Sequence, residues 1–206
     1  MISLRNLSFG YSKGNVTITN ITYDFLEGNL YILQGANGVG KTTLLKLLLG
    51  LLKPTSGDIQ FPNGLTSSYL PDNNGLYENL TVFQNIKFRL GLYNTRYKDK
   101  EEEINQWLQE FELHKIMTKK VGSLSLGTKK KVAIICSCIV PSNFLVLDEP
   151  LNGLDKKARE VFLSHLNRMR SPDKIIICVS HDLNIISANR IILKSTCLDW
   201  PKESGE

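Results

Sequence analysis

The residues best suited to chemistry form one glycine-rich stretch, Gly35-Ala36-Asn37-Gly38-Val39-Gly40-Lys41-Thr42-Thr43. Two glycines frame four residues and precede Lys and Thr, a spacing typical of loops that bind nucleotide phosphates. Glycines let backbone N–H groups point at the phosphates with no Cβ in the way. Lys41 would place its ammonium against the β- and γ-phosphate oxygens, and the Thr42 hydroxyl would ligate Mg²⁺. The expected nucleotide contacts are Gly35, Asn37, Gly38, Gly40, Lys41, Thr42 and Thr43.

The flanking sequence supports this interpretation. Residues 28–34 form an apolar run with the length of a buried strand, and residues 43–49 are strongly helical, with Gly50 as a stop. Strand, loop and helix is the order that a phosphate-binding loop requires, and the helix adds its positive N-terminal end. The alternative is a chance glycine-rich turn, against which the flanks and the Lys-Thr register argue.

A second chemical group follows another predicted strand. Residues 144–147 are continuously apolar, as inside a parallel sheet, and lead directly into Asp148 and Glu149. Ligands bind at the carboxyl edge of open α/β sheets. Asp148 would hold Mg²⁺, and Glu149 could act as general base towards a water molecule. The alternative is a pair of solvated turn residues, which the four preceding apolar residues argue against.

The histidines fall into two groups. His181 follows the predicted strand 174–179, so it should emerge at the same sheet edge, where it could hydrogen-bond a γ-phosphate. His114 and His165 are interpreted as an ordinary loop residue and an ordinary helix residue. Only His181 is therefore expected to take part in the site.

Composition sets the class of the protein. The chain has 206 residues, of which 42% are hydrophobic and 22% charged, typical of one globular domain with a sizeable core. The net charge of +5 is mild, and basic residues are scattered apart from Lys129-Lys130-Lys131, so no nucleic-acid partner is expected. Three of the four cysteines, Cys136, Cys138 and Cys178, lie in apolar stretches and are expected to be buried and reduced in a cytoplasmic setting.

Membrane attachment is expected to need another chain. Met1 leads straight into a strand-like segment, so no signal peptide is expected, and no apolar run is long enough to span a bilayer. If the protein acts at a membrane, a partner must therefore supply the spanning helices.

Hydrophobic periodicity predicts the remaining elements. Strands are expected at 2–7, 16–18, 21–23, 59–61, 67–70 and 191–193, with a hairpin turn at 13–15. Helices are expected from a Thr81 cap to 92, from about 99 with a buried stripe of Ile104, Trp107, Leu108 and Phe111, from 125 to 140, and over 156–170 after an Asp155 cap. The helical block between two α/β parts indicates an inserted subdomain.

Taken together, these motifs in this order resemble an ATP-binding cassette (ABC) ATPase over Ile2 to about Leu193. The resemblance implies a P-loop NTPase α/β core with a mostly parallel sheet, an N-terminal antiparallel β subdomain and an inserted α-helical subdomain. A single domain, 1–206, would divide into a core with its β subdomain (1–70 and 141–195), a helical subdomain (about 72–140) and a tail (196–206).

The resemblance also implies roles for residues. Tyr11 would stack on adenine, and Leu124-Ser125-Leu126-Gly127-Thr128 would be the family signature. Asp148 and Glu149 match the Walker B aspartate and catalytic glutamate, residues 151–155 the D-loop and His181 the switch histidine. Glu149, His181 and Lys41 are thus the expected catalytic residues for hydrolysis of ATP.

In this family two cassettes pair head to tail around MgATP. Ser125 and the Gly127 N–H would reach the γ-phosphate of the partner. The expected partners are a second copy of the chain and a multi-spanning membrane permease, with the cassette on the cytoplasmic face of the membrane. The stretch from Leu70 to Tyr77, together with the signature, looks most like cassettes of drug, bacteriocin or lantibiotic exporters.

Two departures from the family pattern leave alternatives open. Leu126 and Thr128 replace the usual Gly and Gln of the signature. Asp72 stands where the family usually has Gln; it can ligate Mg²⁺ but cannot donate as an amide does. One alternative is a soluble cassette acting on a protein, ribosome or nucleic-acid assembly. Another is a module that holds ATP without turning it over, against which Glu149 and His181 argue.

Overall fold

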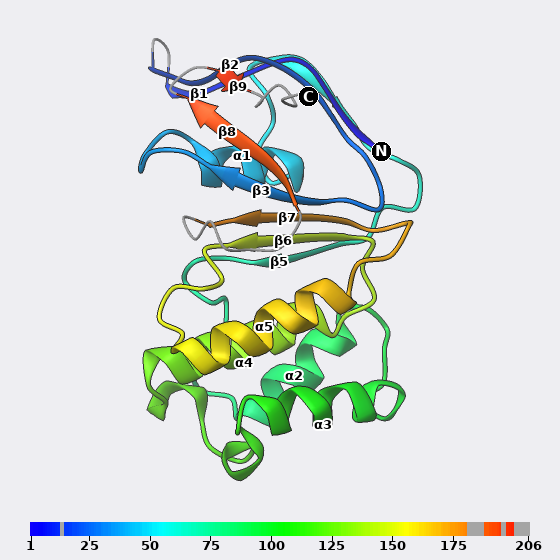
Figure 1. The fold of residues 1–206 in the computed structure, drawn as a ribbon, viewed down its shortest axis with the longest axis vertical. Coiled ribbons are helices and arrows are strands. Elements are labelled where there is room, and N and C mark those ends of the chain that lie inside the picture. The colour runs from blue at the N-terminus through cyan, green and yellow to red at the C-terminus, as the bar shows by residue number, and fades with distance from the viewer. Residues whose placement is uncertain (13–14, 181–187, 195–196, 200–206) are drawn as a thin grey trace, which may run out of the picture.

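A computed structural model describes residues 1–12, 15–180, 188–194 and 197–199, and its strands form two sheets (Figure 1). The first is antiparallel, in the order β2-β1-β4, from β1 (Ile2–Ser12), β2 (Asn15–Phe25) and β4 (Ser56–Gln60). The second has the order β5-β6-β7-β3-β8-β9 and is parallel except for the β8–β9 pair. Its strands are β3 (Leu30–Gln34), β5 (Ser67–Leu70), β6 (Phe144–Asp148), β7 (Ile175–Val179), β8 (Asn189–Lys194) and β9 (Cys197–Asp199). The predicted fold class is confirmed.

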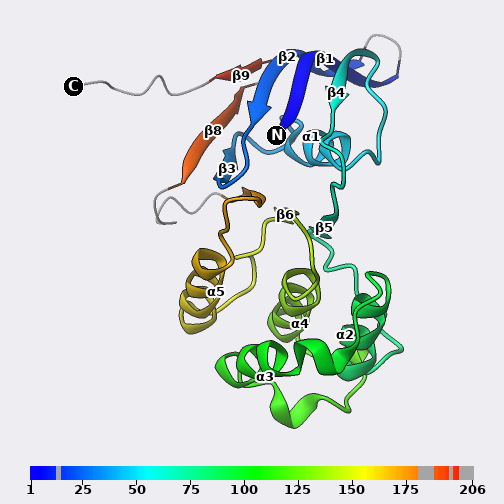
Figure 2. The same ribbon diagram turned by 90° about the vertical axis from the view of Figure 1, so that its right-hand side faces the viewer.

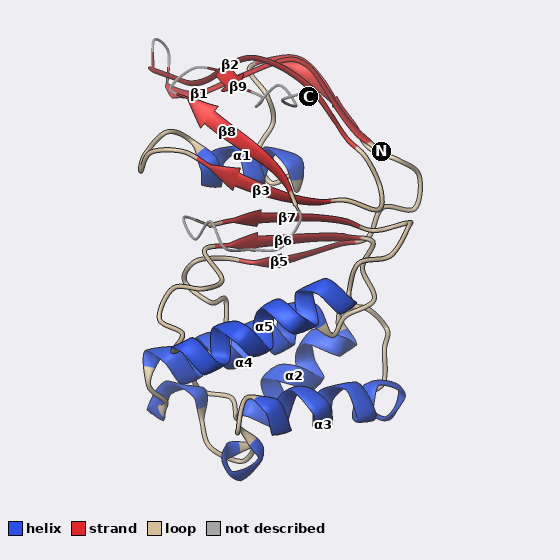
Figure 3. Cartoon of the chain, in the orientation of Figure 1, coloured by secondary structure: helices blue, strands red, loops and turns tan. Residues whose placement is uncertain are grey.

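Helices cover both faces of the parallel sheet. Helix α1 (Lys41–Leu48) lies between the two sheets, whereas the other helices gather beyond the opposite face (Figures 1 and 2). These are α2 (Val82–Gly91), α3 (Glu101–Glu110), α4 (Leu126–Cys138) and α5 (Lys156–Arg168), with short 3₁₀ turns at Tyr97–Lys100, His114–Ile116 and Val121–Ser123. Helices α2 to α5 thereby lie apart from the strands, whereas α1 lies among them (Figure 3).

The central strands are apolar on both sides because both sides are covered. On β6, Leu145 and Leu147 pack into the cluster with α2–α5, while Phe144 and Val146 pack into the cluster with α1 and the antiparallel sheet. The stripe predicted on α3, with Ile104, Trp107, Leu108 and Phe111, is buried in the former cluster, as expected. The parallel sheet therefore separates two hydrophobic cores.

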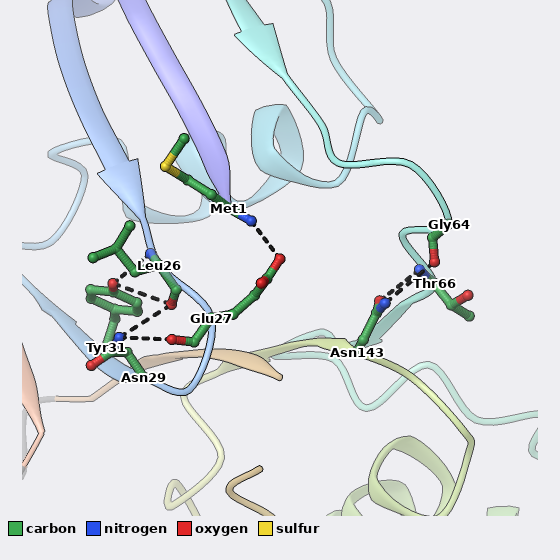
Figure 4. A network of polar contacts seen from close by, with 8 residues as sticks. All are labelled: Met1, Leu26, Glu27, Asn29, Tyr31, Gly64, Thr66 and Asn143. Carbon is green, nitrogen blue, oxygen red and sulfur yellow. Dashed lines mark hydrogen bonds and ion pairs between the residues drawn. The ribbon is translucent and has the colours of Figure 1, made fainter. Parts of the chain in front are cut away.

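Polar contacts fasten the loops at the amino ends of β3, β5 and β6 (Figure 4). The Tyr31 hydroxyl accepts a hydrogen bond from the Leu26 N–H at 2.7 Å. Asn143, just before β6, accepts from the Thr66 N–H at 2.8 Å and donates to the Gly64 carbonyl at 3.3 Å. These contacts lie at the amino ends of the strands, opposite to the carboxyl ends, so their role is to stabilise the sheet.

Several predicted elements needed correction. The pieces predicted at 16–18 and 21–23 form the single strand β2, whose pairing with β1 is interrupted by register shifts and whose Asn20 has a φ of 50°. Strand β1 continues to Ser12 and not only to residue 7 as predicted, so Tyr11 lies near the end of a strand. Helix α1 begins at Lys41, two residues earlier than predicted, and strand β9 was not predicted. Local irregularities broke the alternation that marks a strand, so one long strand looked like two.

The three cysteines in apolar stretches are buried, as predicted. Cys136, Cys138 and Cys178 are buried and free, and burial raises the pKa of the Cys136 and Cys138 thiols to about 12. Among the residues that the structure describes, we found no helix with both the length and the apolar character needed to cross a bilayer.

Candidate functional site

The phosphate-binding loop connects β3 to α1 and depends on glycine at defined places. Gly38 and Gly40 have φ values of 78° and 107°, which favour glycine. A Cβ on Gly40 would lie 3.0 Å from the Thr17 Cγ2, and a Cβ on Gly35 only 2.5 Å from the Leu193 carbonyl oxygen. Gly40 caps α1 without a side-chain hydrogen bond, so the first N–H groups of the helix face the loop. Such N–H groups are suited to bind an anion.

Lys41 folds its side chain back over this loop. Its ammonium donates to the carbonyls of Gly35 and Ala36, at 2.8 and 3.1 Å, and the residue is only 8% exposed. A buried cation held by neutral carbonyls can exchange them for phosphate oxygens, which bind it more strongly.

Thr42 and Asp148 meet across the end of β6. The Thr42 hydroxyl donates to the Asp148 carboxylate at 2.9 Å, and Asp148 is buried. Burial raises the pKa of Asp148, Asp72 raises it further, and Thr42, Lys130 and Lys41 lower it. A buried carboxylate beside a hydroxyl provides the hard oxygen ligands that Mg²⁺ prefers, so this pair fits the ion.

Glu149 directly follows the last residue of β6 and has an unusual backbone conformation. Its φ is 48°, in the left-handed region that glutamate rarely adopts, and its N–H donates to the Val179 carbonyl at 3.2 Å. Its side chain lines the same cavity as Asp148. The turn thereby brings two consecutive carboxylates to one site, where strand geometry would have pointed them to opposite faces.

A cavity of about 580 Å³ lies at this edge of the sheet. It is lined by Tyr11, Thr17, Asn37, Gly38, Gly40, Lys41, Thr42, Thr43, Asp72, Asp148 and Glu149. Tyr11 is 60% exposed, and its hydroxyl lies 3.1 Å from that of Thr43. Most of the predicted contacts therefore meet around one hollow. Thr17, on β2, is a lining residue that we did not predict, because the alternating pattern of β2 marks it only as a strand residue.

Asp72 follows β5 and borders the cavity on the side of the helices. The residue is exposed, and its main-chain carbonyl accepts a hydrogen bond from the Lys130 ammonium at 3.3 Å. Burial raises the pKa of the nearby Tyr69 to about 12, and the carboxylates of Asp148 and Asp72 add to this effect. Negative charge is thus concentrated where β5 and β6 end.

The signature residues lie outside this cavity. Ser125 caps α4: its hydroxyl accepts from the Thr128 N–H at 3.3 Å and lies 2.8 Å from the Thr128 hydroxyl. Leu126 is 78% exposed, and a Cβ on Gly127 would lie 2.8 Å from the Gly153 carbonyl oxygen. Thr128, a departure from the family pattern, therefore gives Ser125 a hydroxyl partner.

Two of the three histidines lie in the part of the chain that the structure describes. His181 lies outside the described residues. His114 begins a 3₁₀ turn rather than an irregular loop, and His165 is buried in α5, where it stacks on Trp107 and meets Glu110 at 2.9 Å. Neither of these two histidines lines the cavity.

Comparison with known proteins agrees with this geometry. The model of the ABC transporter family matches residues 18–152, more than half of the chain. The cytochrome c biogenesis ATP-binding export protein CcmA of Reclinomonas americana is 33% identical over 204 residues, 95% of this chain and 91% of that protein. The zinc import ATP-binding protein ZnuC of Rickettsia conorii is 32% identical, over 92% of this chain and 79% of that protein.

A solved structure described as the ATP-binding subunit of an ABC transporter superimposes with a TM-score of 0.87 at 25% identity. The alignment covers 96% of this chain and 88% of that one. Sequence, fold and motif order thus agree, and we conclude that the chain belongs to the ABC transporter family, as an ATP-binding and ATP-hydrolysing subunit.

Proposed function

We propose that the chain binds MgATP in the 580 Å³ cavity, hydrolyses it and uses the cycle to drive transport through a separate membrane subunit. One observation carries the proposal. Lys41, Thr42, Asp148 and Glu149, which come from two stretches more than a hundred positions apart, line this one cavity at the carboxyl edge of the sheet.

In this proposal the phosphates occupy the loop. Lys41 turns from the carbonyls of Gly35 and Ala36 to the β- and γ-phosphate oxygens, and the start of α1 contributes N–H groups. Tyr11 lines the cavity with an exposed ring that can stack on adenine.

Thr42 and Asp148 are the proposed Mg²⁺ ligands, with Asp72 as a third carboxylate at the same cavity. When bound, the ion would neutralise charge on the phosphate oxygens. The ion would give the buried carboxylate of Asp148 a partner of opposite charge.

Glu149 is the proposed general base. It takes a proton from a water molecule as the water oxygen bonds to the γ-phosphorus, while the bond from that phosphorus to the bridging oxygen of ADP breaks. ADP and inorganic phosphate leave, and the proton returns from Glu149 to solvent. His181 is proposed to hydrogen-bond the γ-phosphate.

A second copy of the chain is the proposed partner at the phosphates. Ser125 and Gly127 stand apart from the cavity of their own chain, and Leu126 beside them is exposed, so this end of α4 is available to another molecule. In a head-to-tail pair, Ser125 and the Gly127 N–H would cap the γ-phosphate bound by the other chain.

For the membrane side, we propose a multi-spanning partner that holds the cassette at the cytoplasmic face. We propose export as the direction, since residues 70–77 and the signature resemble those of exporter cassettes, and one relative, CcmA, is named for export. The test is co-expression of the chain with a candidate multi-spanning membrane protein. ATP-dependent movement of cargo into inverted vesicles would support export, whereas movement out of them would reverse the assigned direction.

Glu149→Gln tests the hydrolytic mechanism. It removes the proton acceptor but keeps the shape, so turnover should fall by roughly 10²- to 10⁴-fold. MgATP should still bind and hold two chains together, so size-exclusion chromatography should show twice the mass only with ATP. The matched control is Glu160→Gln on the exposed face of α5, which should behave as wild type. Normal hydrolysis by Glu149→Gln would remove Glu149 from the role of base, and an inactive variant that stays monomeric with ATP would refute the pairing.

A further inference from the structure

The run Lys129-Lys130-Lys131 occupies the start of α4, directly after the signature, and each lysine contacts a different segment. Lys129 pairs with Glu78 at 2.7 Å, and Lys131 pairs at 3.3 Å with Asp155, the residue that caps α5. Lys130 donates to the main-chain carbonyl of Asp72. The run is therefore engaged within the protein, at the point where α4 meets the loops around the site.

Lys130 differs from its two neighbours in burial. Lys130 is 4% exposed, whereas the side chains of Lys129 and Lys131 are 16% and 19% exposed. The partners of these two lysines, Glu78 and Asp155, are 66% and 63% exposed. Burial lowers the pKa of Lys130, and the carboxylates of Asp72, Asp148 and Glu149 oppose this shift. Its ammonium is thus held at the segment of Asp72, which lines the cavity, and its charge interacts with those of the three carboxylates there.

The negative charge at the site points to a role for Lys130. Asp72 adds a third carboxylate to Asp148 and Glu149 at the end where the γ-phosphate is proposed to bind. Like charges that share a site disfavour one another, and a buried cation offsets that repulsion. Lys41 is the cation that lines the cavity at the phosphate loop, and Lys130 is a second cation, buried and hydrogen-bonded to the main chain of Asp72.

We propose that Lys130 is a positioning residue for ATP hydrolysis. It ties the Asp72 segment to the helix that carries Ser125, and its charge offsets the negative charge that Asp72 brings to the site. This inference rests on the proposed function, because it assigns Lys130 a part in the same reaction. Since Lys130 does not line the cavity, it acts through Asp72 and its neighbours and not on the nucleotide directly.

The experiment measures steady-state ATP hydrolysis by Lys130→Met, which keeps the length of the side chain and removes its charge. We expect kcat to fall about 10-fold or more and KM for ATP to change less than about threefold, because Lys41 still binds the phosphates. Lys129→Met is the matched control: it removes the same charge from the same helix turn but faces an exposed partner, and it should retain the wild-type kcat.

Two further variants separate charge from packing. Lys130→Arg keeps the charge and should retain most of the kcat. Asp72→Asn introduced into Lys130→Met should raise kcat by about fivefold or more, because it removes the charge that Lys130 no longer offsets. If Lys130→Met does not fold, as judged by thermal unfolding, Lys130→Gln replaces it in the same design.

Three results would overturn the inference: wild-type kcat in Lys130→Met, an equal loss in Lys129→Met, or a loss that Asp72→Asn does not relieve. Failure of the proposed function gives a different outcome. In that case the wild-type protein does not hydrolyse ATP, or Glu149→Gln hydrolyses it normally, whatever Lys130 does.

Discussion

Replacing Lys41 with Met tests how the phosphate loop binds ATP. The variant keeps most of the apolar stem and removes the ammonium, which in the structure donates to two carbonyls, of Gly35 and Ala36. The lysine must give up these hydrogen bonds to reach phosphate. Its contribution to ATP affinity is therefore a difference between two sets of contacts, and that difference can be worked out.

At about 3 Å and an effective dielectric constant of about 20, an ammonium attracts one phosphate charge by roughly 5–6 kcal/mol. The two carbonyl bonds given up by Lys41 are worth about 1.5 kcal/mol each, at the low end for a charged donor. The net of about 2–3 kcal/mol predicts that Lys41→Met binds ATP roughly 30- to 150-fold more weakly. Without nucleotide, Lys41→Met loses these two hydrogen bonds but no longer has to bury an ammonium. The two effects largely cancel, so the free energy of unfolding should change by less than about 1.5 kcal/mol.

Isothermal titration with MgATP gives the affinity, and urea unfolding gives the stability. Lys46→Met, one turn further along α1, is the control and should bind ATP as wild type does. Affinity within threefold of wild type for Lys41→Met would refute the role of Lys41. Normal affinity together with a loss of stability above 3 kcal/mol would show that the lysine serves to hold the loop.

Three further predictions concern single side chains. Tyr11→Ala should weaken ATP binding by about 1–3 kcal/mol through lost stacking, and Tyr11→Phe should weaken it only mildly, as measured by the same titration. An unchanged ATP affinity in Tyr11→Ala would make Tyr11 an ordinary strand residue. Because Glu149 has a φ of 48°, Glu149→Gly should be about 1 kcal/mol more stable to urea than Glu149→Ala, and equal stability would argue against backbone strain there. Burial lowers the pKa of His165 below its usual 6.5. As the pH falls, the unfolded chain therefore takes up a proton at this ring before the folded chain does. The folding stability that the neutral ring contributes is then lost from about pH 6.5 downwards. Urea unfolding at pH 7.5 and 5.5, followed by tryptophan fluorescence, should show this loss in wild type and not in His165→Gln. Equal losses in the two proteins would assign the loss to other groups.

The sequence was most informative where one residue type has one physical use. The glycines at 35, 38 and 40, the lysine and threonine after them, and the carboxylates after an apolar strand could all be assigned to one sheet edge, because parallel strands end there together. The caps predicted at Thr81 and Asp155 likewise marked helix starts correctly, and the structure adds a capping box between Thr81 and Gln84.

The sequence was least informative where a contact depends on tertiary packing. Thr17 has no local signal that it borders the cavity, since its place there comes from the approach of β2 to Gly40. Lys130 looked like one of three surface lysines, and only the packing of α4 against the Asp72 segment separates it from its neighbours. The turn at Glu149 is similarly invisible, because nothing in its residue type suggests a left-handed backbone.

The close approach of Gly127 to the Gly153 carbonyl has a consequence for cooperativity. Gly153 is four residues beyond Glu149, so its position is linked to the site where its own chain would hydrolyse ATP. In the proposed pair, Gly127 belongs to the site of the other chain. The contact, which leaves no room for a side chain, is then a mechanical link between two nucleotides, and a change at one site would alter the affinity of the other.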